Sequence, residues 1–458
     1  MAATNGNAHV NGNAHVNGNA HVNGNAHVNG NAHVNGHAYL NGNGQVNGNG
    51  EANVPLDASA IAISANTPDL VPDLLAKIAA SGKSFAANDF KARTELLDAA
   101  TALVRAVETP REAMIRIAWS QSTLYACIQV GIDLGLFKAL SKDDKPKTAS
   151  ELAEAVGADP KLVARILKHL NAMGAIHETG PDTYSRTGFS TSLTLENFSN
   201  SYPCMTLCIT DGIMALPELL KKNGYRTPSN GSDCGFQIGY KTDLHFFEWL
   251  KSHPLAAKQF NDHMSAYHQG RPSWMDAGFY DVPQLIQGVE DVLLVDMGGS
   301  LGHDLSEFRR KWPDAPGRLV LQDLPEVVEG AKAASLDPSI ELQAHDFFTE
   351  QPIKGARAYY MHSILHDWTN ENALKILKNI VPAMKRGYSK VLINENVIPS
   401  TNAYWETTSL DIIMMSDFAS TERTAGDWQE LVEAVGLKIV KIWTAQRGVE
   451  SLIECELA

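Results

Sequence analysis

The fold of this chain is decided by the stretch Val292-Leu293-Leu294-Val295-Asp296-Met297-Gly298-Gly299-Ser300-Leu301-Gly302-His303-Asp304. Its first half is a short apolar run with valine at two positions, which is typical of a buried strand in a parallel sheet. Its second half is a glycine turn before a helix, where glycine lets the backbone come close to a ligand at the helix N-terminus. The stretch therefore predicts a strand, a ligand-binding turn and a helix in succession.

The alternation of apolar runs and helical patterns continues to the end of the chain. We expect seven strands, at residues 292–296, 318–322, 340–344, 358–361, 390–394, 437–444 and 451–456. We expect the helices between them to begin near Asp304, Pro325, Asn370, Trp405 and Ala425. Strands that alternate with helices predict the α/β class, with one open parallel sheet covered by helices.

The glycine turn lacks the fingerprints of dinucleotide and phosphate loops. G-x-G-x-x-G would need glycine at positions 300 and 303, where the chain has Ser300 and His303, and no G-x-x-x-x-G-K-[ST] is present. Asp323, at the end of the next predicted strand, is suited to hydrogen-bond a ribose diol. The glycine cluster by itself is equally compatible with a plain strand-to-helix turn.

Helical patterns fill the chain before this region. Segments 81–112 and 115–140 are predicted as amphipathic helices, and 249–267 is the clearest helix between residues 189 and 288. Residues 148–173 have the punctuation of a helix-turn-helix, with a cap at Thr148 or Ser150, a stop at Gly157 and a start at Asp159-Pro160. Segments 175–178 and 183–186 then predict a β-hairpin wing.

A winged helix raises the alternative of a DNA-binding transcriptional regulator, which the charges disfavour. Between Thr148 and Leu193, four basic residues stand against five acidic ones, and the whole chain has a formal net charge of -14. Neutralisation of phosphates by Lys and Arg supplies most non-specific DNA affinity. We therefore expect no nucleic-acid partner and a structural, dimerising winged helix.

The N-terminal segment repeats Asn-Gly-Asn-Ala-His-Val with a six-residue period. One small apolar pair per repeat buries too little surface to offset the chain entropy of ordering, so we expect residues 1–60 to be disordered. Two alternatives are a metal site built from the repeated histidines and a β-helix. Evenly spaced histidines in a flexible tail lack the fixed geometry that a metal site needs.

Composition predicts a cytoplasmic protein without a membrane partner. No stretch approaches the roughly 18 apolar residues of a membrane span, and the N-terminus lacks the basic and apolar regions of a signal peptide. The five cysteines are scattered, odd in number and never spaced as C-x-x-C, which argues against a disulfide framework or a zinc ribbon.

Five motifs together resemble, in order and spacing, those of plant and fungal caffeate-type O-methyltransferases. They are Val295-Asp296-Met297-Gly298-Gly299-Ser300-Leu301-Gly302, Gln322-Asp323-Leu324-Pro325, His345-Asp346-Phe347-Phe348, Leu365-His366-Asp367-Trp368 and Thr421-Glu422-Arg423-Thr424. The resemblance covers about residues 80–458 and is greatest to fungal enzymes that methylate polyketide and related aromatic metabolites. It implies a helical, winged-helix dimerisation domain over 61–195, a helical connector contributing to the acceptor pocket over 196–288, and a Rossmann-like, seven-stranded methyltransferase domain over 289–458.

The resemblance also implies that S-adenosylmethionine is the cosubstrate. The residues that would hold it are Gly298, Gly299, Gly302, Asp323, Leu324, Asp346, Phe347 and His362. The glycines would line its methionine and ribose parts, and Asp323 would hold the ribose hydroxyls. Leu324, Asp346 and Phe347 would surround the adenine. Ser300 departs from a third glycine of the family, and His362 from a common Lys or Arg.

By the same resemblance, His366 is the general base, and Glu395 and Glu422 orient and polarise it. Phe260, Met264 and Met414 would wall an apolar slot for a flat aromatic acceptor. A histidine with the ordinary pKa near 6.5 is largely neutral at pH 7 and accepts the hydroxyl proton, an effect worth about 10² to 10⁴ in rate. This scheme requires no metal.

The implied function is S-adenosylmethionine-dependent O-methylation of a small aromatic metabolite by a homodimer. The long apolar helices between residues 81 and 140 support the dimer, since they would expose too much apolar surface alone. The alternative is a fold relative that catalyses a non-methylating cyclisation or pericyclic rearrangement with the cofactor bound. Loss of the base would be its simplest mark, and the presence of His366, Glu395 and Glu422 favours methylation.

Overall fold

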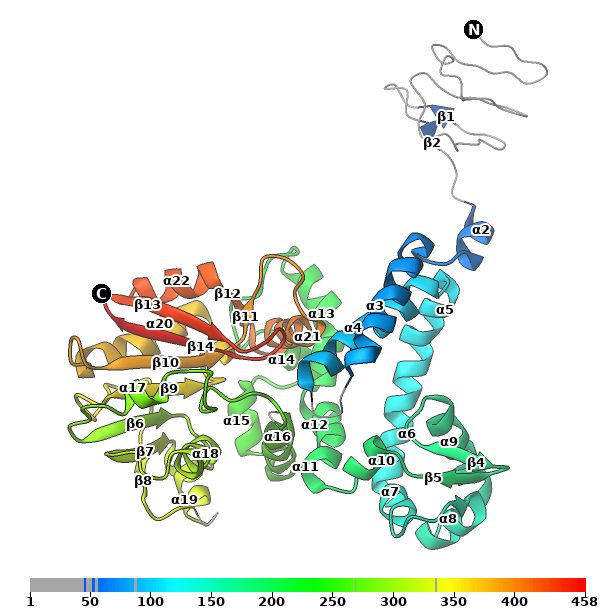
Figure 1. Cartoon of the computed structure of the whole chain (residues 1–458), viewed down its shortest axis with the longest axis horizontal. Coiled ribbons are helices and arrows are strands. Elements are labelled where there is room, and N and C mark those ends of the chain that lie inside the picture. The colour runs from blue at the N-terminus through cyan, green and yellow to red at the C-terminus, as the bar shows by residue number, and fades with distance from the viewer. Residues whose placement is uncertain (1–44, 47–51, 54–56, 86–88, 268, 334–335) are drawn as a thin grey trace. The chain divides into compact units, whose positions relative to one another are not determined.

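The computed structural model describes residues 45–46, 52–53, 57–85, 89–267, 269–333 and 336–458 (Figure 1). The chain divides into two compact units, residues 1–127 and 128–458. Most of the expected disordered segment 1–60 lies outside the described residues. Within it, β1 (Gln45–Val46) pairs with β2 (Ala52–Asn53), and α2 (Ala58–Ile63) begins where the carboxylate of Asp57 accepts the N–H of Ser59.

From Asp57 onward, the described part of the first unit is helical. Its elements are α2, a short 3₁₀ turn Pro68–Leu70, α3 (Val71–Ser84), α4 (Phe90–Val107), α5 (Pro110–Ile115), the π-helix Arg116–Ser120 and the start of α6 (Gln121–Asp133). The expectation of one helix over 81–112 is wrong. Thr109 and Glu112 form a capping box with Pro110 in the first turn, so a new helix begins there.

The second unit opens with the predicted winged helix. Its elements are α7 (Leu136–Leu140), β3 (Lys147–Thr148), α8 (Ala149–Val156), α9 (Pro160–Ala172), β4 (His177–Gly180) and β5 (Thr183–Ser185). Thr148 caps α8, Gly157 ends it in the left-handed conformation, and Asp159 caps α9, as the sequence predicts. The helix expected over 115–140 is interrupted, because Gly135 takes a positive φ of 72° between α6 and α7.

Short helices connect the winged helix to the sheet. They are α10 (Gly188–Ser192), α11 (Glu196–Ser199), α12 (Ser201–Cys208), α13 (Thr210–Lys222), α14 (Gly235–Tyr240), α15 (Phe246–Lys251), α16 (Pro254–Tyr267) and α17 (Val282–Leu285). The helix expected over 249–267 is split, since Pro254 disfavours helical backbone at the preceding residue and starts α16.

The stretch Glu196–Lys222 corrects the expectation that no segment of the chain is apolar and long enough to resemble a membrane span. By length and hydropathy alone it passes the test for a membrane-crossing helix. The structure divides it into α11, α12 and α13, and Cys204, Cys208 and Leu219 from it lie in an apolar core cluster. Helices that contribute to a protein core pass the same test, so this stretch is weak support for a membrane span.

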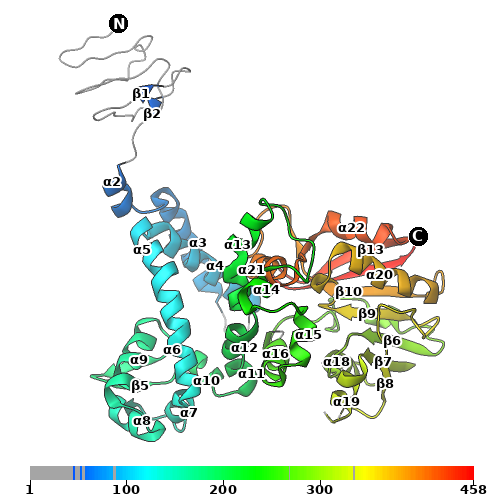
Figure 2. The same cartoon turned by 180° about the vertical axis from the view of Figure 1, so that it is seen from behind.

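Seven strands form the large sheet (Figure 2). Their spatial order is β13 (Leu437–Thr444), β14 (Ser451–Leu457), β10 (Lys390–Glu395), β9 (Ala358–His362), β6 (Val292–Met297), β7 (Arg318–Asp323) and β8 (Ile340–Ala344). β14 runs antiparallel to the other six strands of this sheet. The predicted strands are confirmed to within one residue at each end.

Alternate residues of the strands enter two cores, one on each face of the sheet. Leu319 and Leu321 of β7 pack on one face with α17, α18 (His303–Lys311) and α19 (Pro325–Ala333). Val320 points to the other face with α20 (Asn370–Ile380) and α22 (Ala425–Glu433). This alternation follows from the two-residue period of a strand.

The connector, expected at 196–288, and the sheet, expected within 289–458, share a core. Trp274, Met275 and Tyr280 pack in the same apolar cluster as the sheet residues Leu294 and Tyr360. The winged helix, connector and sheet accordingly belong to one compact unit. The remaining elements are α21 (Trp405–Ile413), the π-helix Met414–Phe418 and the parallel pair β11 (Val397–Ile398) and β12 (Arg423–Thr424).

Candidate active site

The glycine turn after β6 is folded too tightly for side chains. Gly298 and Gly302 have positive φ angles of 76° and 79°. A Cβ on Gly299 would lie 2.5 Å from Oδ2 of Asp296, and one on Gly302 would lie 2.6 Å from Cδ2 of Leu336. Real Cβ atoms essentially never come within 3 Å of another atom, so a side chain at either position would force its neighbour to move. The backbone therefore forms a close cradle at the carboxyl edge of the sheet.

Asp323 lies directly against this cradle, at the end of β7. Its Oδ2 accepts the backbone N–H of Ser300 at 2.8 Å, and its Oδ1 accepts that of Leu324 at 2.7 Å. Burial raises the pKa of the carboxyl, an effect that these two N–H donors oppose. Each carboxylate oxygen has a second lone pair, so the pair of oxygens remains able to accept a ribose diol.

The turn after β8 brings Phe347 close to the cradle. A Cβ on Gly298 would lie 3.6 Å from Cε1 of Phe347, whereas the carboxylate of Asp346 is exposed and caps the N–H of Phe348 at 2.9 Å. Sequence reasoning missed what holds this turn in place. The buried amides of Gln322 and Gln351 exchange hydrogen bonds of 3.0 and 2.8 Å across it.

His362 closes the other side of the cradle in a cluster of charged groups. Its Nδ1 lies 2.6 Å from Oδ2 of Asp304, which also accepts the hydroxyl of Tyr360 at 2.7 Å. Burial lowers the pKa of the imidazole, but Asp304, Glu450 and Asp296 raise it to about 9. His362 is therefore cationic at neutral pH, as the Lys or Arg of relatives would be.

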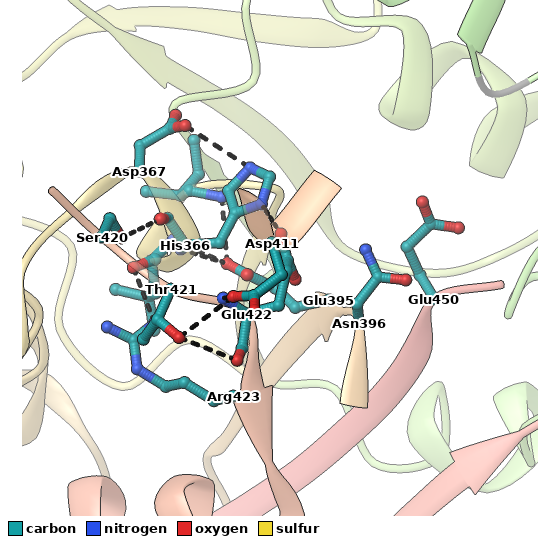
Figure 3. A network of polar contacts seen from close by, with 12 residues as sticks. His366, Asp367, Glu395, Asn396, Asp411, Ser420, Thr421, Glu422, Arg423 and Glu450 are labelled. Atoms are coloured by element: carbon teal, nitrogen blue, oxygen red, sulfur yellow. Dashed lines mark hydrogen bonds and ion pairs between the residues drawn. The ribbon is translucent and has the colours of Figure 1, made fainter. Parts of the chain in front are cut away.

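The proposed base lies in a 3₁₀ turn, Leu365–Asp367, that follows β9 (Figure 3). Nδ1 of His366 lies 2.6 Å from Oε1 of Glu422, and Nε2 lies 3.5 Å from Oδ1 of Asp367. The imidazole is buried between these two carboxylates. Because Nδ1 faces the closer carboxylate, we assign its proton there, which leaves Nε2 to accept a proton from an acceptor.

Glu395 acts mainly on the backbone that carries His366. Its Oε1 accepts the N–H groups of Ile364, Leu365 and His366 at 3.1, 2.6 and 3.3 Å. No hydrogen bond joins this carboxylate to the imidazole among the described residues, although its charge helps to raise the pKa of His366. Of the two predicted glutamates, Glu395 therefore acts through the turn, and Glu422 is the one that pairs with the ring.

Three residues without a predicted role join the turn that carries His366 to the segment that carries Glu422. Arg423 donates to the carbonyls of Leu365 and Trp368 at 2.8 and 3.0 Å. Ser420 donates to the carbonyl of His366, and Asp411 accepts the N–H of Glu422 at 2.8 Å. Arg423 stands beside Glu422 in a quoted motif, which is the signal that would have found it.

The buried carboxylates control the electrostatics of the base. Burial opposes a charge on His366, but Glu422, Asp367 and Glu395 together raise its pKa to about 10. Burial raises the pKa of Asp367 to about 7 and also raises that of Glu395. The surrounding carboxylates therefore make His366 a stronger base than an ordinary histidine.

The same groups also have the composition of a metal site. His366, Glu395 and Glu422 each present a ligand atom within 4.8 Å of the others. An imidazole and two carboxylates suit a divalent cation such as Zn²⁺. The hydrogen bond between His366 and Glu422 accounts for the same cluster without a metal, as a base and the carboxylate that orients it.

The three predicted acceptor residues lie on two elements. Phe260 and Met414 belong to one apolar cluster with Phe246, whose ring lies 5.3 Å from that of Phe260. Met264 follows Phe260 by one turn on α16 and is half-buried. Phe260 and Met414 are therefore brought together, and Met264 lies on the same side of α16 by its spacing.

The arrangement combines a cradle with a ribose-binding carboxylate, a cationic histidine and a buried base beside an apolar cluster. The residues present therefore fit an adenosyl cosubstrate at the glycine turn and proton removal at Nε2 of His366. Both sets lie at the carboxyl ends of β6, β7 and β9, the edge where open α/β sheets bind ligands.

Comparison with known proteins agrees with this fold. Residues 244–438 match the O-methyltransferase domain, and residues 120–196 match the O-methyltransferase dimerisation domain. The chain is 39% identical to the O-methyltransferase mpaG of Penicillium brevicompactum over 84% of this chain and 98% of that protein. It is 38% identical to the demethylsterigmatocystin 6-O-methyltransferase of Aspergillus parasiticus, over 69% and 81% of the two chains.

Solved structures show the same architecture. LepI in complex with SAM matches with a TM-score of 0.77 and 30% identity, covering 85% of this chain and 99% of that one. A structure described as a pericyclic reaction enzyme matches equally well, with a TM-score of 0.77, 30% identity, and 85% and 100% coverage. OxaC, at 24% identity and a TM-score of 0.75 over 85% and 99% of the chains, shares the fold.

Proposed function

The chain belongs to the O-methyltransferase family, and from that premise we propose a specific reaction for it. The acceptor is a hydroxyl of a small aromatic, polyketide-like metabolite, and His366 is the general base. The observation that carries the proposal is the buried imidazole of His366, which Glu422 holds at Nδ1 and whose Nε2 lies 3.5 Å from Oδ1 of Asp367. S-adenosylmethionine, when bound, supplies the methyl group.

The protein side of this reaction is proton removal and positioning. Nε2 of His366 takes the proton as the acceptor oxygen forms its bond to carbon, and the carboxylate of Glu422 stabilises the imidazolium that results. A phenol has an ordinary pKa of about 10, as tyrosine does, so a base whose pKa is also raised to about 10 is well matched to it. The aromatic acceptor class is supported by the Phe260 and Met414 cluster.

We assign cofactor contacts to the cradle residues Gly298, Gly299 and Gly302, to Asp323 and Leu324, and to Phe347. His362 is assigned to the methionine carboxylate, because it is the cation at that side of the cradle. Asp346 has the weakest support, since its carboxylate is exposed and engaged in its own turn. We further propose that the reaction needs no added metal, which predicts full activity after dialysis against a chelator.

The working form is proposed to be a cytoplasmic homodimer with the domain boundaries expected from the sequence. The dimerisation-domain match over 120–196 supports this assembly. Large apolar side chains exposed on the first unit also support it, since a lone chain would leave them in water. They include Leu97, Val104, Val107, Met114, Ile117 and Trp119.

One experiment tests the central proposal. Tritiated methyl transfer from labelled S-adenosylmethionine to a panel of phenolic polyketides is compared for wild type, His366→Ala and the control His177→Ala, an exposed wing residue. We expect labelled product from wild type and control, and a loss of about 10² to 10⁴ in rate for His366→Ala. Wild-type activity in His366→Ala would remove the base from the mechanism.

The similarity to a pericyclic reaction enzyme makes a rearrangement the second candidate. It predicts a product isomeric with the substrate and no consumption of S-adenosylmethionine. Mass spectrometry of the same incubations separates the two, since methylation adds the mass of one CH₂ group. The intact pair of His366 and Glu422 favours methylation, because a rearrangement needs no base for a phenol.

A further inference from the structure

Arg271 lies buried where three segments around the candidate site meet. Only 11% of its side chain is exposed, and its Nη1 lies 2.5 Å from Oε1 of Glu450. Its Nη2 pairs with Glu406, and its guanidinium carbon lies 4.2 Å from the ring centroid of Tyr267. This one side chain therefore contacts the last residue of α16, the first turn of α21 and the residue before β14.

These three segments carry the two halves of the proposed reaction. The acceptor wall lies on α16, with Phe260, and just beyond α21, with Met414. Glu450 lies on the cofactor side, because Ser451, the next residue, pairs with Glu395 of β10, and the neighbouring Asn394 pairs with His362 of β9. In agreement with this placement, the charge of Glu450 raises the pKa of His362, after the larger effect of Asp304 and against the effect of burial. Arg271 is therefore the physical link between the acceptor wall and the cofactor end of the sheet.

Tyr267 is the aromatic partner of this link. Burial raises the pKa of its phenol, and the charges of Glu450 and Glu422 raise it further. The ring therefore lies within electrostatic reach of both Glu450 and the carboxylate that holds His366. The guanidinium above the ring limits where the end of α16 can move.

The chemistry of this position favours arginine. Two carboxylates from different elements are held at once, and the planar guanidinium does this with donors in a fixed fork, whereas the ammonium of lysine is a compact charge with freely rotating donors. Glu450 is only 7% exposed, so loss of its partner would leave a buried, uncompensated charge. Because separating this pair would leave a buried charge without a partner, the pair holds its geometry more strictly than an exposed ion pair does.

We propose that Arg271, through Glu450 and Glu406, is a positioning residue that sets the acceptor wall relative to the cofactor end of the site. The proposal rests on the proposed function for the roles of Phe260, Met414 and His362. It differs from a purely structural ion pair, which would support folding without affecting substrate or cofactor binding.

The first test compares Arg271→Met, Arg271→Lys and Glu406→Gln with the control Arg318→Met. Arg318 also pairs with two carboxylates, Asp291 and Glu341, but at the opposite edge of the sheet. We expect a fall of about 10²-fold in kcat/KM for the acceptor in Arg271→Met, mainly through KM, since a misplacement of about 1 Å costs that much. Arg271→Lys should restore little, and Arg318→Met should match wild type.

A folded Arg271→Met with wild-type KM values would overturn the proposal, even if its melting temperature fell. If Arg271→Met does not fold, Glu406→Gln decides instead, because Glu406 is 39% exposed and its loss leaves the buried pair intact. That variant is expected to raise the acceptor KM by a smaller factor, and an unchanged KM there would count against the proposal.

The second test needs no acceptor, so it remains valid if methyl transfer is absent. S-adenosylmethionine affinity is measured by calorimetry against pH for wild type, Glu450→Gln and Arg318→Met. The groups that face His362 are Asp304, Asp296, Glu450 and Tyr360. Removing the charge of Glu450 lowers the pKa of His362, so the decline of affinity at high pH should begin at a lower pH. The same profile in wild type and Glu450→Gln would refute the link to the cofactor end.

Discussion

Nδ1 of His366 lies 2.6 Å from Oε1 of Glu422, a carboxylate with no exposed surface. The two residues are 56 positions apart in the chain, one in the turn after β9 and the other just before β12. The pair orients the ring, assigns its proton and supplies the negative charge that an imidazolium needs. Most of the catalytic predictions follow from this contact.

Glu422→Gln and Glu395→Gln are expected to differ in effect. Glutamine at 422 loses the charge that stabilises the imidazolium, so kcat should fall by about 10² or more. Glu395→Gln keeps an oxygen that accepts three N–H groups, so the fall in kcat should be clearly smaller for this variant. Methyl-transfer kinetics measure both, with S-adenosylmethionine affinity as the folding control. Equal losses would show that Glu395 acts directly on the ring.

The rate should rise with pH well beyond neutrality. His366 must be neutral to accept a proton, and its pKa is raised to about 10, so the neutral fraction grows about tenfold per pH unit below that value. In Glu422→Gln the pKa falls, and the plateau should be reached at a lower pH with a lower maximum. Single-turnover rates between pH 6 and about 10 give this profile. A wild-type rate independent of pH would contradict a titrating base.

Asp323→Asn should weaken S-adenosylmethionine binding. The carboxylate accepts two backbone N–H groups, from Ser300 and Leu324, and the amide NH₂ of asparagine would face one of them as a second donor. An unpaired buried group costs about 1 to 3 kcal/mol, or roughly 10- to 100-fold in Kd. Calorimetry with Asp337→Asn as control, a carboxylate in an exposed turn, tests this. Unchanged affinity would place the ribose elsewhere.

Gly302→Ala should reduce both stability and cofactor affinity. Its φ is 79°, and a Cβ would meet Leu336 at 2.6 Å and Leu321 at 3.0 Å. Gly355→Ala is the matched control, with a φ of 68° but no atom within 4 Å of the added carbon. Both variants share a backbone penalty of about 1–2 kcal/mol. Thermal unfolding should show the larger loss for Gly302→Ala, and only that variant should bind S-adenosylmethionine more weakly. Equal losses would mean that the cradle has room for a methyl group.

The sequence by itself determined the elements and the site motifs. The seven strands of the large sheet are predicted to within one residue, because a buried strand is marked by a local apolar run between breakers, whereas the short pair β11 and β12 is not predicted. The glycine turn, Asp323 and the His366 motif were also visible locally. Helix ends were predicted less well where a proline or glycine restarted the chain, as at Pro110 and Pro254.

Only the tertiary structure decided how these residues act on one another. That Glu395 holds a backbone turn, that Gln322 pairs with Gln351, and that Arg271 reaches Glu450 across 179 residues are facts of packing. The raised pKa of His366 likewise depends on carboxylates gathered from separate segments. Sequence periodicity reports the local surroundings of a residue, whereas hydrogen bonds and charge interactions depend on distances that exist only once the sheet has brought its carboxyl ends together.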